Sequence, residues 1–399
     1  MIDLFQVEKL LKESARQLDE MKAETLNNGE AFNLFTILKL ERKENKTHSG
    51  FICELLNPRG SHHKGTLFLK LFLETIHSDH LDMDSVSTKP EYHIGARNDE
   101  TKSGGRIDIY LWDKNNKSIS IENKIDAYDQ NFQIERYVNH QPHINKVFYL
   151  NLFGANPSVS SAGQLVAGKD FFIISYKNEI LAWLEKCCNS VSDLPIIREN
   201  IRQYLLLIKK LTYSMDKKHE TSLLKTMLEN NEAASFVAIN YFTYKANFNE
   251  SIRNEVYNQV SRQLGSLYNV ERGQAATKEY AQIWIKLKEK GNLPLYFGLE
   301  NFSIHSTENT GIYVGIYSPE GAAKKYNINA EYENWPFYTD CLSFDGQLVN
   351  LSHSEFLKFI LSNEGVKERF ISYLVDETVT YIRSETPHLL TYLSSANNA

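Results

Sequence analysis

Apolar residues recur at helical spacing in the first quarter of the 399-residue chain. Leucine and valine lie three or four positions apart within residues 1–30, which predicts an amphipathic helix. A second helix is predicted over 31–56, ending at the NPRG turn of 57–60, because proline and glycine both oppose its continuation. Residues 67–76 are apolar enough to form a buried helix.

Beyond residue 92 the spacing changes to strict alternation. Isoleucine and leucine occupy every second position of 107–111 and, except at Asn123, of 119–125, and an asparagine-rich turn separates these segments, which predicts a β-hairpin. Further segments alternate between the two patterns: a helix over about Tyr128–His140, strands over 146–150 and 171–175, and helices over 178–186 and 196–211. Alternation of helices and strands predicts an α/β core.

The polar stretch Met215–Glu220 predicts a boundary, which gives domains over residues 1–215 and 216–399. The second domain is predicted to be an α+β module. Its expected elements are one or two helices up to about Leu267, strands over 281–287, 293–299, 311–317 and 337–344, and helices over 354–362 and 366–383.

The predicted hairpin carries a candidate site. Residues two apart in a strand point to the same face, so Glu122 and Lys124 project together. If the apolar residues of both strands, Ile107 among them, share one face, then Asp108 lies on the opposite face, together with Glu122 and Lys124. Since opposed residues share a face, this pairing requires an odd-numbered loop or a bulge near 115–117, where asparagine tolerates a left-handed conformation.

Two carboxylates and an ammonium on one face favour a bound cation. Like charges a few ångströms apart repel each other, and a divalent ion relieves that repulsion. Oxygen ligands select Mg²⁺ or Mn²⁺, which can polarise a phosphodiester oxygen and acidify a bound water. Lys124 would position that water or stabilise the developing charge. A Glu-x-Lys triplet alone also fits a solvated strand face, and the upstream GRID segment makes the pattern more specific.

These motifs resemble those of the PD-(D/E)xK nuclease superfamily, with Ile107 where a proline often stands. Residues 33–215 are more specifically similar to a bacterial family within it. The matching segments are ENKTHS (44–49), LLNPRGSH (55–62), GRIDI (105–109), IENKI (121–125), QIERY (133–137) and ISY (174–176).

The resemblance implies a restriction-endonuclease-like core, in which helices flank a mixed sheet. It also implies site residues. Asp108 and Glu122 would be the main metal ligands, aided by the backbone carbonyl of Asn123, and Glu44 would complete the coordination directly or through water. Together with Lys124, these three acidic residues would form the catalytic set.

The resemblance further implies substrate contacts on the helix after the hairpin. Gln133 and Tyr137 lie four apart, so they share a helix face. They would orient Lys124 or contact a phosphate, although packing alone fits them equally well. Arg106 and Arg136 are candidate phosphate contacts.

Cysteine and histidine do not point to a second metal. The four cysteines form no CxxC pair, which indicates neither zinc nor a disulfide framework and suits a reducing cytoplasm. His48, His62 and His63 lack cysteine partners and the HExxH spacing, so His48 is expected to form bonds within the turn region or to support the site. No apolar stretch approaches about 18 residues, so a cytoplasmic protein without a membrane span is expected.

The net charge of −6 excludes a protein that coats nucleic acid by bulk attraction, but it allows one local basic groove. The resulting interpretation is a Mg²⁺-dependent nuclease, with DNA favoured over RNA and endonuclease action not separable from exonuclease action. Resemblance suggests bacterial genome defence, including antiphage defence. The second domain would select substrate or form a homodimer. Alternatives are a non-catalytic nucleic-acid-binding or assembly protein, and an RNase or nuclease toxin.

Overall fold

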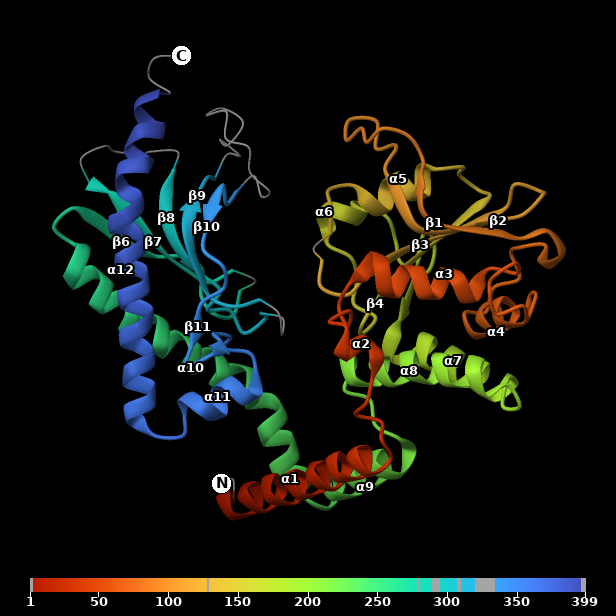
Figure 1. Cartoon of the computed structure of the whole chain (residues 1–399), viewed down its shortest axis with the longest axis horizontal. Coiled ribbons are helices and arrows are strands. Elements are labelled where there is room, and N and C mark those ends of the chain that lie inside the picture. The colour runs from red at the N-terminus through yellow and green to blue at the C-terminus, as the bar shows by residue number, and fades with distance from the viewer. Residues whose placement is uncertain are drawn as a thin grey trace. The chain divides into compact units, whose positions relative to one another are not determined.

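Figure 1 shows a computed structural model of the chain, which divides into two compact units. One unit is Glu8–Asn230, and the other comprises Asn231–Ala399 together with Met1–Val7. Each has its own hydrophobic core. The structure describes residues 3–127, 129–278, 280–288, 295–306, 310–319 and 334–395.

A five-stranded mixed sheet forms the centre of the first unit. Its strands follow one another in chain order across the sheet: β1 (Ser87–His93), β2 (Arg106–Trp112), β3 (Ser118–Lys124), β4 (Asn145–Asn151) and β5 (Phe172–Ser175). Strand β2 is antiparallel to both β1 and β3, whereas β3, β4 and β5 run parallel to one another.

Helices cover both faces of this sheet (Figure 1). The larger core lies on the face covered by α3 (Gly50–Leu56), α4 (Leu67–Thr75), α7 (Leu181–Ser190) and α8 (Pro195–Leu211). The smaller core lies under α5 (Gln133–Asn139) and α6 (Val159–Ala162). The predicted α/β restriction-endonuclease-like core is therefore confirmed.

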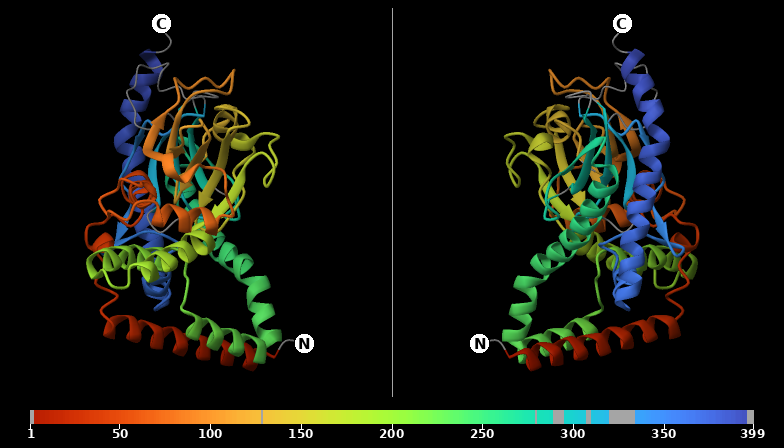
Figure 2. Two further views of the ribbon diagram at one scale, coloured as in Figure 1. Left: turned by 90° about the vertical axis from the view of Figure 1, so that its right-hand side faces the viewer. Right: turned by 90° about the vertical axis from the view of Figure 1, so that its left-hand side faces the viewer.

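Two further helices of this unit lie side by side (Figures 1 and 2). They are α1 (Leu4–Asn27), which was predicted over residues 1–30, and α9 (Lys217–Glu229). The Gln17 amide donates to the Thr226 hydroxyl at 2.7 Å, and Lys218 pairs with Glu24 at 2.7 Å. The predicted domain boundary at 215/216 falls between α8 and α9.

The prediction of one continuous helix over 31–56 is wrong. The segment is broken into α2 (Leu34–Ile37), the π-helical turn η1 (Glu44–Ser49) and α3. Asn33 caps α2 through its side chain, and Lys39 adopts a left-handed φ of 55°, which ends the helix after one turn. Six consecutive polar residues, 41–46, interrupt the apolar spacing in this segment, a signal that the prediction did not use.

Smaller corrections concern other elements. Phe132 has a left-handed φ of 57°, so α5 begins at Gln133, later than predicted; Tyr128 lies outside the described residues. Strand β1 was not predicted. It contains Pro90 and lacks apolar alternation, which an edge strand tolerates. Two short helical segments complete the unit: η2 (Met83–Ser85) and η3 (Tyr176–Ile180).

The β2–β3 hairpin has the predicted register, with Ile109 opposite Ile121. The amide of Asp113 donates to the carbonyl of Lys117 at 3.0 Å, which leaves a three-residue loop between them. Asn116 in this loop has a left-handed φ of 61°. The odd-numbered loop and the role of asparagine are therefore confirmed.

Ile107 departs from the predicted face. Instead of joining the larger core it packs in the smaller one, with Tyr110 and Tyr137. The cause lies in the edge strand, where Glu91 adopts a left-handed φ of 52° and the β1–β2 pairing skips Glu91 and Asp108. Because the strands turn at this point, residues on either side of Asp108 face opposite layers.

The second unit is an α+β module, as predicted. Helices α10 (Asn231–Leu264) and α12 (Glu364–Ser395) pack on one face of its antiparallel sheet (Figure 2). The sheet order is β10 (Phe337–Tyr338), β9 (Tyr313–Tyr317), β8 (Tyr296–Glu300), β7 (Gln282–Leu287) and β6 (Tyr268–Arg272). The remaining elements are β11 (Ser343–Phe344), β12 (Gln347–Leu348) and α11 (Ser354–Ile360). Leu293 and Pro294, in the predicted strand 293–299, lie outside the described residues.

No helix in the described part of the chain is both long enough and apolar enough to cross a membrane.

Candidate active site

The candidate site lies where β2 and β3 separate. Their pairing ends at Ile109 and Ile121, one residue short of the position at which Asp108 would lie opposite Glu122. Beyond that point Asp108 Oδ2 accepts a hydrogen bond from the Asn123 amide at 2.8 Å. The Asp108 carboxylate therefore pairs with the Asn123 amide of β3, which the backbone of β2 would otherwise do.

Glu122 is buried at this opening, with 1% of its surface exposed. Its Oε1 lies 2.7 Å from the Lys124 ammonium, and its Oε2 is buried with no hydrogen-bond partner among the described residues. Burial raises the pKa of the Glu122 carboxyl, with Lys124 acting in the opposite sense. Burial lowers the pKa of Lys124, but the surrounding carboxylates outweigh it, so the net shift is upward and the ammonium is retained.

Two more carboxylates belong to the same cluster. Burial, and then the charge of Glu122, raises the pKa of Asp108 well above its ordinary value. Glu44 comes from η1, and its Oε2 accepts a hydrogen bond from the Ile125 amide at 2.6 Å. Its charge raises the pKa of both other acids. Three acidic groups therefore surround one ammonium, an imbalance that a cation would relieve.

The donor set fits a divalent cation in its chemistry. The unpaired Oε2 of Glu122 is a buried oxygen without a donor among the described residues. In a strand the amide and carbonyl of one residue point the same way, so the Asn123 carbonyl faces the opening beside Asp108. Within the described ranges no three His, Cys, Asp or Glu side chains are already arranged around a common metal position.

The Asn123 side chain points away from this opening and ties β3 to η1. Its Nδ2 donates to the Ser49 hydroxyl at 2.9 Å, and its Oδ1 accepts from the Tyr176 hydroxyl at 2.7 Å. All three residues are buried. These bonds fix the strand that carries Glu122 against the turn that carries Glu44.

His48 supports the same turn. Burial lowers its pKa to about 4, so the ring is neutral near pH 7. Its Nε2 therefore donates to the Glu41 carbonyl at 2.8 Å, and its Nδ1 accepts from the Tyr204 hydroxyl at 2.9 Å. In the E-x₃-HS motif, His48 and Ser49 thus hold the backbone from which Glu44 projects.

The LLNPRGSH motif closes a turn. A Cβ at Gly60 would lie 2.7 Å from the Glu54 carbonyl oxygen and 2.9 Å from the His62 ring. His62 Nε2 donates to the Asn57 carbonyl at 3.0 Å, while its Nδ1 accepts from the Lys64 amide at 3.0 Å. Both ring nitrogens are occupied by the turn, which leaves neither for a metal.

Gln133 and Tyr137 lie together on α5, 3.5 Å apart at their polar ends. The Tyr137 hydroxyl donates to the Arg106 carbonyl, and it also lowers the pKa of Glu122, which it approaches. Gln133 accepts from the Gln130 amide at 3.3 Å. Tyr137 therefore connects α5 to the opening, whereas orientation of Lys124 or phosphate contact by this pair stays a prediction.

The two predicted arginines differ in placement. Arg106 is exposed and pairs with Glu91 at 2.5 Å on the edge strand. Arg136 is buried, donates to the Asn131 carbonyl and lies 3.4 Å from Asp99.

Sequence reasoning did not assign roles to several residues that hold the site or lie beside it. These are Ser49, Tyr176, Tyr204, Arg97 and Asp99. A tyrosine directly after a predicted strand was the signal for Tyr176; the others follow only from tertiary contacts.

One known family model matches the part of the chain that carries this candidate site. Residues 32–206 match the family model described as the PD-(D/E)XK nuclease superfamily, a span that includes all five strands of the mixed sheet and the residues of the opening. Comparisons with curated proteins and with solved structures gave no match. On this evidence the region spanning residues 32–206 belongs to the PD-(D/E)XK nuclease superfamily.

Proposed function

We propose that this protein hydrolyses phosphodiester bonds of DNA with the help of Mg²⁺ or Mn²⁺. Asp108, Glu122, Lys124 and Glu44 would form the active site. The observation that carries the proposal is the buried Glu122 carboxyl, one oxygen of which has no hydrogen-bond partner in the described part of the chain. It lies beside two further acids and one ammonium at the opening between β2 and β3. Membership of a nuclease superfamily supplies the reaction class.

Asp108, Glu122 and the Asn123 carbonyl would hold the cation, with Glu44 completing its coordination. A divalent cation bound there supplies Lewis-acid polarisation of the phosphodiester and a more acidic water. The protein contributes position: the Asn123 amide holds Asp108, and the Ile125 amide holds Glu44.

Lys124 supplies positive charge to the transition state. Its ammonium is kept protonated by the neighbouring carboxylates and is held by Glu122 at 2.7 Å. Because the phosphorane gains negative charge during attack, an ammonium fixed beforehand stabilises it more than it stabilises the bound substrate. A poor metal ligand with a permanent charge suits this role.

The finer assignments rest on resemblance. DNA is proposed over RNA, and genome defence in the cytoplasm is proposed as the setting. The second unit would select substrate or pair two copies of the chain.

A nuclease assay tests the proposal. Purified protein is incubated with supercoiled plasmid, linear duplex and single-stranded RNA, each with Mg²⁺, Mn²⁺ or EDTA. Cleavage of DNA with metal and none with EDTA is expected. Opening of supercoiled circles would identify endonuclease action, and loss of linear ends alone would identify exonuclease action.

Two variants serve as controls for this assay. Asp108→Ala should abolish cleavage, whereas Asp193→Ala removes the same charge from an exposed position between α7 and α8 and should cleave normally. If the wild type cleaves no substrate with any metal, the protein is a binding or assembly protein that retains the nuclease fold.

A further inference from the structure

The segment 96–103 connects β1 to β2 beside α5 and is held at both ends by glycine. Gly95 and Gly104 have φ values of 110° and 75°, which side chains with a Cβ rarely adopt. A Cβ at Gly104 would overlap the Ala96 carbonyl. Lys102 also pairs with Glu135 at 2.9 Å, and its carbonyl accepts from Asn139 at 3.0 Å.

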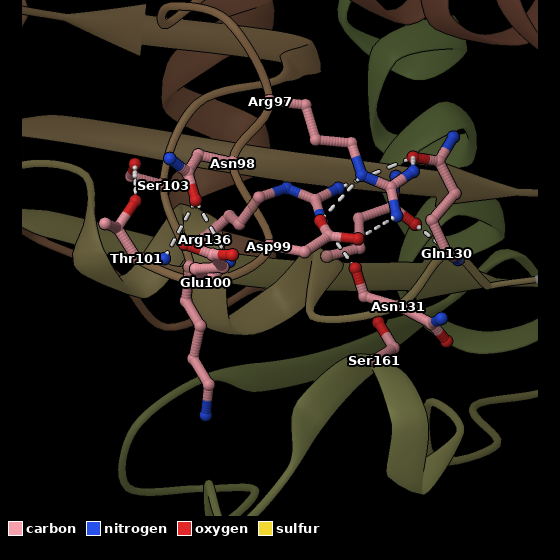
Figure 3. Close-up of polar contacts among 12 residues, drawn as sticks. Arg97, Asn98, Asp99, Glu100, Thr101, Ser103, Gln130, Asn131, Arg136 and Ser161 are labelled. Carbon is pink, nitrogen blue, oxygen red and sulfur yellow. Dashed lines mark hydrogen bonds and ion pairs between the residues drawn. The ribbon is translucent and has the colours of Figure 1, made fainter.

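Two arginines share one carboxylate in this segment (Figure 3). Arg97 donates through two nitrogens to both oxygens of Asp99, at 2.7 and 2.6 Å. Arg136 lies 3.4 Å from the same carboxylate. Gln130 Oε1 accepts from Arg97 at 3.3 Å and from Arg136 at 3.4 Å. The group therefore contains two guanidinium charges and one carboxylate.

Arg136 is the incompletely paired member of the group. It is 2% exposed, and its Nε is buried with no hydrogen-bond partner among the described residues. Burial, and then the charge of Arg97, lowers its pKa. A buried guanidinium is costly unless anions and acceptors surround it, so this position favours an additional negative charge.

The arginine pair lies next to the candidate active site. A Cβ at Gly105 would lie 3.5 Å from Arg136 Nε, and Gly105 directly precedes β2, the strand that carries Asp108. Tyr137, the next residue after Arg136, bonds to the Arg106 carbonyl and approaches Glu122. A nucleic-acid strand with one phosphate at the opening can therefore place a neighbouring phosphate at the arginines.

We propose that Arg97 and Arg136 form a binding subsite for a backbone phosphate of the substrate, and that Asp99 occupies the place of that phosphate in the free protein. The two-nitrogen contact of Arg97 with Asp99 is the geometry in which arginine also binds phosphate. Lys102 and Glu135 keep the segment in place when Asp99 moves away. The identity of the ligand rests on the proposed function; the anion site itself rests on the arginines.

Substitutions at Asp99 and Arg97 separate this subsite from a plain surface ion pair. Affinity for a fluorescently labelled DNA duplex is measured by anisotropy in EDTA over a series of salt concentrations. Asp99→Asn should tighten binding by about tenfold and steepen the dependence of log K on log salt by about 1, because one more phosphate contact forms freely. Arg97→Gln should weaken binding and make that dependence shallower by about 1. The double variant should lose the gain.

Glu199→Gln is the matched control. Glu199 is also a carboxylate between two arginines, Arg198 at 2.9 Å and Arg202 at 3.8 Å, but on α8. The Glu199→Gln variant should therefore bind the DNA duplex with unchanged affinity and unchanged salt dependence. If Asp99→Asn binds no tighter than Glu199→Gln, or if no variant binds DNA, the subsite is overturned. Because EDTA prevents metal-dependent cleavage, a tighter Asp99→Asn variant supports the subsite even if the Mg²⁺ assay shows no nuclease activity.

Discussion

Two buried glutamates on β-strands, Glu122 in the first unit and Glu300 in the second, show how burial and function differ. They are 1% and 7% exposed. Burial is the largest cause of a raised pKa in both, and it brings the pKa of Glu300 to about 7. Gln282, a neutral amide, is the side chain that opposes this shift at Glu300.

The surroundings of the two carboxyls differ. Glu300 lies where β8 pairs with both β7 and β9, and it can meet the cost of burial by taking up a proton. Glu122 lies where pairing stops, beside Asp108, Glu44 and a charged Lys124. A raised pKa alone therefore does not identify a site. The better basis for proposing a site is the convergence of several acidic side chains where two strands separate.

Among residues that would not bind the metal, Lys124 should show the largest effect on catalysis. Lys124→Met keeps the apolar stem and removes the charge, so kcat should fall by about 10²–10³. Because an ammonium is a poor ligand for a divalent metal, stabilisation by metal should persist. Lys117→Met, an exposed lysine of the hairpin turn, is the control. Wild-type turnover in Lys124→Met would remove this residue from the mechanism.

Glu300 should make the second unit less stable as pH rises. Its folded pKa of about 7 lies above the ordinary value of 4.5, so the stabilisation by the bound proton is fully present below pH 4.5 and is lost as the pH rises through 7. Glu300→Gln removes that dependence. The difference in free energy of unfolding between Glu300→Gln and the wild type should therefore rise by roughly 2–3 kcal/mol, in favour of the variant, from pH 5 to pH 8. Denaturant titrations at both pH values measure this, and a difference independent of pH would contradict it.

Asn123 and Asn249 are buried amides, one in each unit, and the stability losses of their alanine variants can be compared. Asn123→Ala leaves Ser49 and Tyr176 unpaired and should cost about 2 kcal/mol or more of unfolding free energy. Asn249 donates one bond, to the Phe302 carbonyl at 2.9 Å, so Asn249→Ala should cost about 1–2 kcal/mol. If denaturant titrations gave equal losses for Asn123→Ala and Asn249→Ala, the link between β3 and η1 would contribute no more to stability than the single bond of Asn249.

Tyr176→Phe should have the smallest effect. It removes one hydroxyl from Asn123 and keeps the ring, so a loss of about 1 kcal/mol in unfolding free energy is expected. Thermal or denaturant melting measures it. A loss as large as that of Asn123→Ala would place the stability in the Tyr176 hydroxyl rather than in the asparagine.

Local patterning predicted the hairpin and the register of its two strands. The alternation predicted which residues of β2 and β3 share a face. For these residues to lie opposite each other, the loop between the strands must have an odd number of residues, and Asn116 in that loop is left-handed. The same reasoning failed at Ile107, because the left-handed Glu91 on a neighbouring strand turns the sheet there. A residue's own neighbours in sequence do not contain that information.

Contacts distant in sequence account for the other failures. Asn33, which caps the start of α2, also donates from its side chain to the Gln203 carbonyl at 2.8 Å, a contact that fixes where this short helix begins. The pairing of Arg97 and Asp99 with Arg136 joins a loop to a helix more than thirty residues away. Hydrophobic periodicity reports burial along one element, so it cannot specify which polar groups meet across elements.

Metal binding tests the central claim most directly. Melting temperature is measured for wild type, Asp108→Ala and Asp193→Ala as Mg²⁺ or Mn²⁺ is added. An ion that binds only the folded state stabilises it by mass action, so the melting temperature of wild type and Asp193→Ala should rise with metal concentration. In Asp108→Ala that rise should largely vanish. An equal rise in Asp108→Ala, or none in the wild type, would contradict a metal site at the opening between β2 and β3.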